Sequence, residues 1–424
     1  MKKSLIALAA LAAVSAASAQ STVEIYGRAH LAYDNWGATG ASDSAKDVRA
    51  RSRMSDDSSR IGFRINEDLG GGLRAFSVIE TGINIDTATA NGQSGAGNSG
   101  AGYIGTREAH VGIGNGQAEL RLGRQNVWWG NGLIEDVAAN MVHGGVINAY
   151  TAPGAGYVNA PAARADNTYK VVFNKDLVGT MFAGSEVWYS IASNAEQTAA
   201  NADAKAKANG VTLKVTQMPF AAQYDWGKNY NTNNGVDTAS AYAATAVTGN
   251  AVTTKLGAPT LDSSVTGAKL GLAYFYAPTS KVAFINTTMQ MGFTTAANNN
   301  VAPVSIQATA SGTAYNVGFR KQVSNSFLVQ HDLGGGNIVM GQYVKQGNVK
   351  DYTGAAVADT GSTAYSLAFR KELSKRTSIS TSYNVINNDK YNNIMANGGG
   401  QASVAYIPQG ATVKVIGLGI LHNF

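Results

Sequence analysis

Residues 59–74 read SRIGFRINEDLGGGLR, and this stretch decides the fold class of the chain. Ile61, Phe63 and Ile65 alternate with polar or small neighbours, and three consecutive glycines, at positions 70–72, follow the run. A period of two places alternate side chains on opposite faces of a β-strand, and consecutive glycines are typical of a tight turn. The stretch therefore predicts a strand with one apolar face, followed by a turn into a second strand.

The same period recurs from one end of the chain to the other, at residues 23–31, 119–125 and 415–420. No run after residue 20 approaches the 18 apolar residues of a membrane-spanning helix. A closed β-barrel is the other structure that satisfies every backbone group in lipid, and its apolar residues are spread at every second position. A soluble sandwich, whose apolar faces would form a core, is the alternative.

Connection lengths favour the barrel. Short connections, at residues 67–72, 114–116 and 174–179, alternate with long stretches rich in small and polar residues, at 84–102, 194–209, 228–264 and 347–361. One rim of short turns and one rim of long loops is typical of a transmembrane barrel. At about 10 residues per strand with such connections, residues 20–424 suffice for about 16 strands.

The N-terminus predicts export. Lys2 and Lys3 precede an apolar run at residues 5–14, and Ala17 to Ala19 form an A-x-A cleavage pattern. These features are those of a secretory signal peptide at residues 1–19, which leaves residues 20–424 as a single barrel domain. Cysteine is absent, so no disulfide stabilises the exported chain.

Composition and motifs argue against an enzyme and against nucleic-acid binding. The net charge is +6, with no block of Lys and Arg. The G-x-G-x-x-G pattern at residues 95–100 lacks the flanking strand and helix of a dinucleotide site. The five histidines have no metal-ligand spacing, and no nucleophile has an identifiable base. We therefore predict no catalytic residue, no cofactor and no metal.

Charged side chains are expected on the inner face. Because a lipid-facing Arg at mid-bilayer costs roughly 2–4 kcal/mol, Arg60 and Arg64 must face the lumen when Ile61 and Phe63 face lipid. The same parity applies to further residues: Arg28, Arg74 and Arg121, with Glu80, Glu108, His110 and Glu119. Arg124 falls on the outward parity, but at a point where the chain leaves the wall. The sequence thus predicts an arginine-rich wall of Arg28, Arg60, Arg64, Arg74, Arg121 and Arg124.

Arg49, Arg51 and Arg53 stand on the parity opposite to Arg60, unless a bulge intervenes near residues 55–58. Solvated rim charge is the simpler interpretation of these three arginines.

Several segments resemble the general porins of Gram-negative bacteria, beta-proteobacterial type. Residues 59–74 look like the second strand, first turn and third strand of that family. Gly123 to Gln125 resembles the strand that leads into its inward loop, Leu373 to Thr377 resembles a late periplasmic turn, and the chain closes on the aromatic Phe424. The likeness runs from residue 20 to residue 424. Two departures are the Val127 to Trp129 segment and the absence of a basic residue beside the terminal His422 and Asn423.

The resemblance implies an outer-membrane barrel of 16 strands, a homotrimer and a third loop folded into the lumen. It implies a passive channel for small hydrophilic solutes and ions, in contact with outer-membrane lipid, lipopolysaccharide and the barrel-assembly machinery. It places the third loop at residues 126–166. On that loop, Glu135 and Asp136 would face the arginine-rich wall, and Trp128 and Trp129 would pack the loop or contact solutes. The excess of arginine predicts a weak anion preference, and Phe424 is the expected assembly signal.

Within the channel class, the alternative is a substrate-selective porin, suggested by Trp128 and Trp129, because aromatic side chains in a lumen can contact solutes. A passive channel, a barrel enzyme and an adhesin barrel are the three classes of function to be separated. A barrel enzyme would need a catalytic cluster on one rim, which the sequence lacks. An adhesin barrel would use the long loops. Liposome swelling separates the three, since only a porin passes sugars without turnover.

Overall fold

The computed structural model describes residues 21–83, 85–86, 104–127, 134, 164–191, 207–230, 247–248, 251–252, 265–291, 305–306, 315–316, 321–350, 354–394 and 407–424. The signal peptide predicted at residues 1–19 lies outside this part of the chain, so it stays a prediction.

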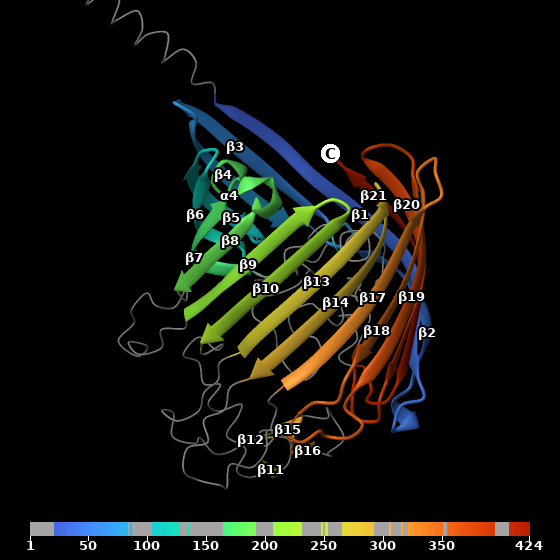
Figure 1. Ribbon diagram of the computed structural model, residues 1–424. Helices are drawn as coiled ribbons and strands as arrows, with labels where there is room; N and C mark the ends of the chain where they lie inside the picture. Colours follow the sequence, from blue (N-terminus) through green and yellow to red (C-terminus); the bar gives the residue numbers. More distant parts are fainter. Residues whose placement is uncertain are drawn as a thin grey trace, which may run out of the picture.

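The described residues form one antiparallel sheet that closes into a barrel (Figure 1). Its strands are β1 (Thr22–Thr39), β2 (Val48–Asp56), β3 (Arg60–Gly70), β4 (Leu73–Gly82), β5 (Glu108–Gly114), β6 (Ala118–Asn126), β7 (Arg164–Phe173), β8 (Ser185–Ile191), β9 (Lys207–Gln217), β10 (Phe220–Tyr230), β13 (Val265–Ala277), β14 (Ser280–Met291), β17 (Lys321–Asp332), β18 (Asn337–Gln346), β19 (Ser362–Glu372), β20 (Thr377–Asn388) and β21 (Thr412–Asn423). Two short hairpins, β11 (Val247–Thr248) with β12 (Ala251–Val252) and β15 (Ser305–Ile306) with β16 (Tyr315–Asn316), stand apart from this sheet.

The long first strand organises the closure. The first part of β1, residues 22–28, pairs with β3, and its second part, residues 31–38, pairs with β2. β2 and β3 therefore lie end to end as one spanning strand, interrupted at residues 57–59, where Ser58 has φ +63°. The other edge of β1 pairs with β21 and closes the barrel. The sheet of 17 strands thus contains sixteen spanning strands, which confirms the predicted fold class.

The two faces of the wall differ as the alternation predicts. In β21, Ile416, Leu418 and Ile420 are exposed on the outward face, while Val415 and Leu421 are buried on the inward face. In β20 the inward positions are mainly small and polar, with Ser378, Ser380, Ser382 and Asn384 all buried. Large apolar side chains exposed at every second position form the lipid-facing surface of such a barrel.

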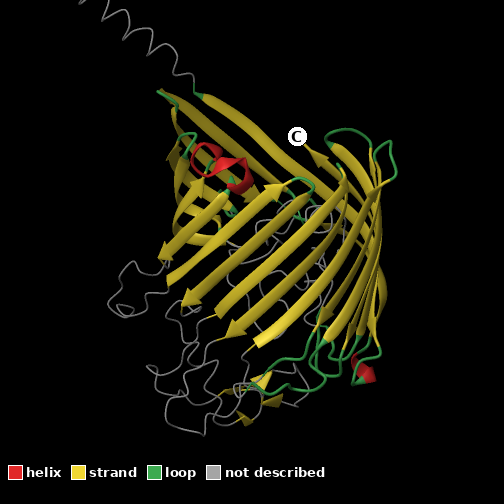
Figure 2. Cartoon of the chain, viewed as in Figure 1, coloured by secondary structure: helices red, strands yellow, loops and turns green. Residues whose placement is uncertain are grey.

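Short connections gather at one rim, and the strand ends that lead into the long connections lie at the other (Figure 2). We expected a plain turn at residues 174–179, but the structure forms the helix α4 (Lys175–Phe182) there, on the short-turn rim. Val178 and Phe182 of this helix line a shallow groove together with Val187 of β8 and Leu213 of β9. A 3₁₀ turn, η1 (Ser44–Lys46), lies at the opposite rim. No helix in the described part of the chain is long and apolar enough to span a membrane.

The described ends of the last long connection, residues 389–394 and 407–411, fold back onto the inner wall. Ile394 and Ile407 pack on inward-facing apolar residues at the long-loop end of the barrel: Trp36, Ala38, Val344, Ala364, Ile386, Val413 and Val415. The Asn392 amide donates to the carbonyl of Gly361 at 2.8 Å, and the Asn388 amide donates to the carbonyl of Ala411 at 2.9 Å. The two described ends of this connection are thereby fixed inside the mouth of the barrel.

Candidate functional site

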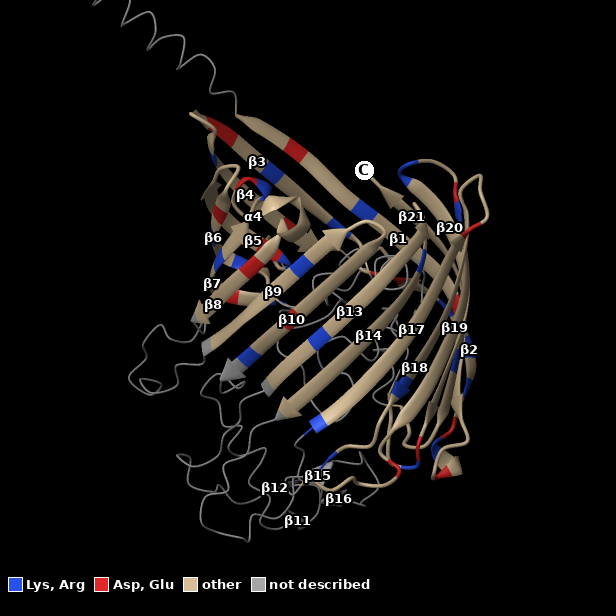
Figure 3. Cartoon of the chain, in the orientation of Figure 1, with Lys and Arg blue, Asp and Glu red and all other residues tan. Residues whose placement is uncertain are grey.

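The inner face of β1 to β8 carries most of the charge of the wall, which Figure 3 shows as the concentration of blue and red segments on those strands. Direct pairing places Arg60 opposite Arg28, Glu24 opposite Arg64, and Glu108 opposite Glu80. The apolar neighbours Ile25 and Phe63 pair with each other on the opposite face. The structure therefore brings Arg28, Arg60, Arg64, Arg74 and Arg121 to the inward face, in the direction that the alternation predicts.

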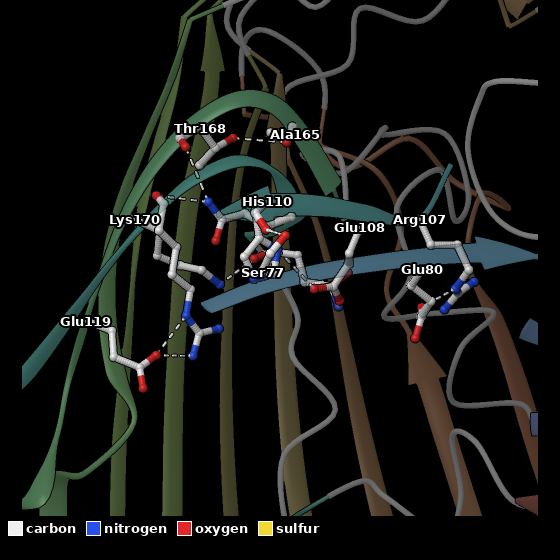
Figure 4. A network of polar contacts seen from close by, with 12 residues as sticks. Ser77, Glu80, Arg107, Glu108, His110, Glu119, Ala165, Thr168 and Lys170 are labelled. Carbon is white, nitrogen blue, oxygen red and sulfur yellow. Dashed lines mark hydrogen bonds and ion pairs between the residues drawn. The ribbon is translucent and has the colours of Figure 1, made fainter. Parts of the chain in front are cut away.

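The first charged centre is built around Glu80. Its carboxylate lies 3.5 Å from Nε of Arg60 and accepts a hydrogen bond of 2.6 Å from Nε of Arg107. The Tyr26 hydroxyl donates to the same carboxylate at 3.2 Å. Tyr26 reaches it across β3 because Gly62 stands between them and has no side chain. One buried carboxylate is thus shared by two guanidinium groups. Figure 4 shows its contact with Arg107.

The second centre repeats the arrangement around Glu119, nearer the short-turn rim. Its carboxylate accepts hydrogen bonds from Arg121, at 2.6 Å and 3.0 Å, and one from Arg74. Both guanidinium groups also lie over the ring of Phe76, at 4.8 Å for Arg74 and 5.7 Å for Arg121. Arg74 crosses β5 at Gly114, where an added Cβ would lie 2.6 Å from Cγ of Glu119. Again one carboxylate serves two guanidinium groups.

Arg28 and Arg64 extend this wall. Arg28 is 5% exposed and donates to the carbonyl of Asp57 at 2.9 Å. Arg64 is half exposed, lies 3.4 Å from the carboxylate of Glu24, and stacks 3.7 Å from the ring centroid of Tyr26. Guanidinium groups bind aromatic faces through the ring quadrupole, and such stacking fixes their direction. Both side chains are therefore held against the inner wall.

Among the basic residues that the predicted set omitted, three lie near these charged centres, on or beside β5 to β7. Lys170 is buried, lies 3.2 Å from the carboxylate of Glu186 and donates to the carbonyl of Asn126 at 2.5 Å (Figure 4). Its alternation with Tyr169 and Val171 would have revealed it. Arg107 and Arg164 stand at strand ends, where parity carries no information about direction. Arg164 interacts electrostatically with Arg107 and Glu108.

Arg124 does not join the two shared-carboxylate centres. It pairs with Ala109, on the outward parity, next to a bulge at Gly123, whose φ is +129°. Its guanidinium donates to the carbonyl of Thr106 at 2.9 Å and to Asp166 at 2.5 Å. Because a β-bulge resets the direction of the following side chains, simple alternation could not settle its role.

Arg51 and Arg53 face inward rather than standing free on the rim. They lie opposite Trp36 and Asp34 in the pairing of β1 with β2, and both guanidinium groups lie 5.4 Å from the Trp36 ring. Nε of Arg53 is 3.0 Å from the Asp34 carboxylate. The break at Ser58 between β2 and β3 resets the alternation, as a bulge near residues 55–58 would.

One described residue of the third loop contacts the far wall. Ile134 is 4% exposed and packs on inward-facing apolar residues of β10 to β18: Ala221, Ala273, Phe275, Ala283, Ile285, Leu328 and Met340. The loop leaves the wall at β6, after the buried Val127, and returns at β7. The predicted loop residues Trp128, Trp129, Glu135 and Asp136 lie outside the described residues.

Phe424 extends the pairing of the last strand, β21, with the first strand, β1, and this junction is the seam of the barrel. The N–H of Phe424 donates to the carbonyl of Gly27 at 3.1 Å, and the N–H of Gly27 donates to the carbonyl of Phe424 at 2.9 Å. The Phe424 ring lies so close to Gly27 that an added Cβ would be 2.2 Å from Cζ.

Comparison with known proteins assigns the family. A sequence profile of the Gram-negative porins matches residues 7–391. The outer membrane porin protein 32 of Delftia acidovorans is 35% identical over 129 residues, which cover 30% of this chain and 32% of that relative. This match thus spans about a third of the relative's length.

Solved structures share the fold. An anion-selective porin from Comamonas acidovorans superposes with a TM-score of 0.63 at 20% identity, over 96% of this chain and 100% of that one. OmpT of Vibrio cholerae superposes with a TM-score of 0.57 at 14% identity, over 95% and 98% of the two chains. OmpF of Salmonella typhi, in complex with daunomycin, gives 0.56 at 15% identity over 95% and 97%. With a profile match over most of its length and a closed barrel of sixteen spanning strands, the chain belongs to the Gram-negative porin family and is a non-enzymatic channel of the outer membrane.

Proposed function

We propose that this porin prefers anions, and that its narrowest part lies where the third loop, residues 126–166, faces the arginine-rich wall. The observation that supports the preference is the repeated sharing of one carboxylate by two guanidinium groups, at Glu80 and at Glu119. Each such centre retains one positive charge, so basic groups outnumber acidic ones on the described inner face of β1 to β8. The name of the Comamonas acidovorans structure, an anion-selective porin, is consistent with this proposal.

The rest of the wall supports a transverse field. In β17 to β20 the inward positions are mostly uncharged, with Arg370 as a buried exception, and the buried neutral polar ones are Gln322, Ser324, Ser326, Gln330, Gln342, Gln346, Ser362, Ser366, Ser378, Ser380, Ser382, Asn384 and Asn388. A positive sector facing a neutral sector attracts anions toward one side of the lumen and orients dipolar solutes. On this proposal, Glu135 and Asp136 supply the opposing negative charge from the loop.

The direct test is the zero-current potential of the purified channel across a tenfold KCl gradient. When the dilute side is about 0.1 M, we expect the zero-current potential to have the sign of an anion-selective channel. The Debye length there is about 10 Å, so wall charges still act on a passing ion. The preference should shrink near 1 M, where the Debye length is about 3 Å. A cation-selective channel under both conditions would contradict the proposal.

The position of the third loop is tested through Ile134. Replacing Ile134 with Asp would bury an unpaired charge among apolar side chains, at a cost of at least about 2 kcal/mol, so the docked state of the loop should become at least about tenfold less populated. We expect single-channel conductance to become larger and noisier. Ile134→Val keeps the apolar contact and serves as the control. Wild-type conductance and noise in the Asp variant, in a folded barrel, would show that the loop does not narrow the channel.

We also infer that the channel assembles as a homotrimer, on the basis of its family membership. Chemical crosslinking of the purified protein in detergent, followed by gel electrophoresis without heating, tests this inference. If the crosslinked protein runs only at the mass of a single chain, the inference is wrong.

A further inference from the structure

A third group with the composition of the charged centres lies on β1 and β2. Arg51 and Arg53 pair directly with Trp36 and Asp34, and both guanidinium groups lie 5.4 Å from the centroid of the Trp36 ring. Nε of Arg53 is 3.0 Å from the Asp34 carboxylate. The centre at Glu119 likewise combines two guanidinium groups, one aromatic ring and one carboxylate. We call Arg51, Arg53, Trp36 and Asp34 the mouth station.

The mouth station stands at the long-loop end of the lumen. β2 begins at Val48, just after η1 on the long-loop rim (Figure 1), whereas the Glu119 centre lies near the short-turn rim. On β1, Trp36 lies ten positions from Tyr26, whose hydroxyl donates to Glu80. At about 3.3 Å per residue this is about 33 Å along the strand, several times the Debye length of about 8 Å at physiological salt. The mouth station is therefore electrostatically separate from the centre at Glu80.

A rigid platform holds the two guanidinium groups of the mouth station. The Trp36 side chain is fully buried in the apolar cluster that contains Ile394 and Ile407, from the two described ends of the last long connection. The buried Asp34 carboxylate also accepts a hydrogen bond of 2.9 Å from the Ser55 hydroxyl. Because guanidinium groups stack on aromatic faces in a defined direction, the ring and the carboxylate orient both arginines before a ligand arrives.

The mouth station has an excess positive charge and unused hydrogen-bond donors. Asp34 offsets the charge of Arg53, but Arg51 is exposed and makes no ion pair with any described residue. Nη1 of Arg53 is buried and donates to no acceptor in the described part of the chain. A buried donor that lacks an acceptor is costly, and an oxygen atom supplied from the lumen would remove that cost.

We propose that the mouth station binds a small oxyanion that enters the channel from the long-loop side. The planar N–H fork of a guanidinium matches two oxygens of such an anion, whereas a halide cannot make this bidentate contact. The second guanidinium on the same ring attracts the same ligand. The inference rests on the proposed anion preference for its role in transport, but the binding site is separate from the narrowest part of the channel.

The first test locates the ligand by anomalous diffraction from crystals of the folded channel soaked in selenate, an oxyanion that contains a heavy atom. We expect a selenium peak within hydrogen-bond reach of Arg51 in the wild type, and no such peak in Arg51→Gln at the same concentration. A bromide soak should leave this position empty. Absence of the wild-type peak, its survival in Arg51→Gln, or an equally strong bromide peak would overturn the proposal.

The second test measures the same binding in a membrane. Phosphate added on the long-loop side of a single oriented channel should reduce the chloride current. Arg51→Gln should raise the phosphate concentration for half of this reduction at least about tenfold, because a charge-assisted bidentate contact contributes about that factor. Lys345→Gln is the matched control, since Lys345 is exposed on the outward face of β18 near the same rim. An unchanged phosphate response in the Arg51 variant would contradict the proposal.

A chemical rescue separates loss of binding from a folding defect. The chain contains no cysteine, so Arg51→Cys provides a unique position for thiol-specific reagents. A reagent that carries an ammonium group should recover part of the phosphate response, and one that carries a sulfonate should not; equal effects of the two would count against the mouth station. The zero-current potential in KCl tests the proposed anion preference separately. A cation-selective wild type whose phosphate response still depends on Arg51 would contradict that preference and retain the mouth station.

Discussion

Deletion of Phe424 is expected to lower the amount of folded barrel in the outer membrane by at least about tenfold. The residue makes two backbone hydrogen bonds with Gly27, and such bonds contribute about 1 kcal/mol each, where 1.4 kcal/mol is a factor of ten. Its ring also covers Gly27 at the seam between the first and last strands. The measurement is the shift in gel mobility on heating, applied to outer-membrane fractions.

The control for this deletion is His422→Ala, which alters an exposed side chain of the same strand and keeps every backbone pair of the seam. We expect wild-type folded levels for the control. If the chain without Phe424 also reaches those levels, the terminal residue is not the assembly signal.

Replacing Arg74 and Arg121 with Glu is expected to turn the channel from anion to cation preference. The two arginines share the carboxylate of Glu119, so the double substitution replaces a centre of net positive charge with three carboxylates on the same wall. In a tenfold salt gradient, with the dilute side at about 0.1 M, the zero-current potential should move by about a third of the roughly 59 mV limit of an ideally selective pore. Both arginines are partly exposed, which favours correct folding of the variant.

Lys371→Glu is the control, since Lys371 faces outward and its charge does not border the lumen. An unchanged potential in a folded Arg74 and Arg121 double variant would mean that this centre does not act on passing ions. A shift of similar size in the Lys371 variant would instead point to a surface effect on the membrane.

The period of two in the sequence predicted the strands and the direction of Arg28, Arg60, Arg64, Arg74 and Arg121. The connection lengths and the chain length added the barrel and its count of about 16 strands. Lipid and water impose that period residue by residue, so it can be read locally. The period of two could not settle which way the Arg124 side chain points, because the bulge at Gly123 interrupts the alternation of side chains. The period also could not place Arg107 on the inner wall, because its hydrogen bond to Glu80 is a tertiary contact made at a strand end.

The shared carboxylates were also beyond sequence reasoning. Glu119 and Arg74 are far apart along the chain, and their contact depends on Gly114 leaving space on the strand between them. Similarly, Tyr26 reaches Glu80 across Gly62. Glycines in a strand pattern indicate close approach of other groups, but which groups approach follows only from the register of three strands. The roles of Trp128, Trp129, Glu135 and Asp136 stay predictions.

The position of β1 has a consequence for the timing of folding. This strand is among the first parts of the barrel to leave the ribosome, yet one of its edges finds its partner only when β21, the final strand, has been made. Pairing between such distant segments is entropically slow. An unpaired strand edge is meanwhile a template for association with other chains. Closure of the barrel therefore waits for β21, and until then the edge of β1 is open to association with other chains.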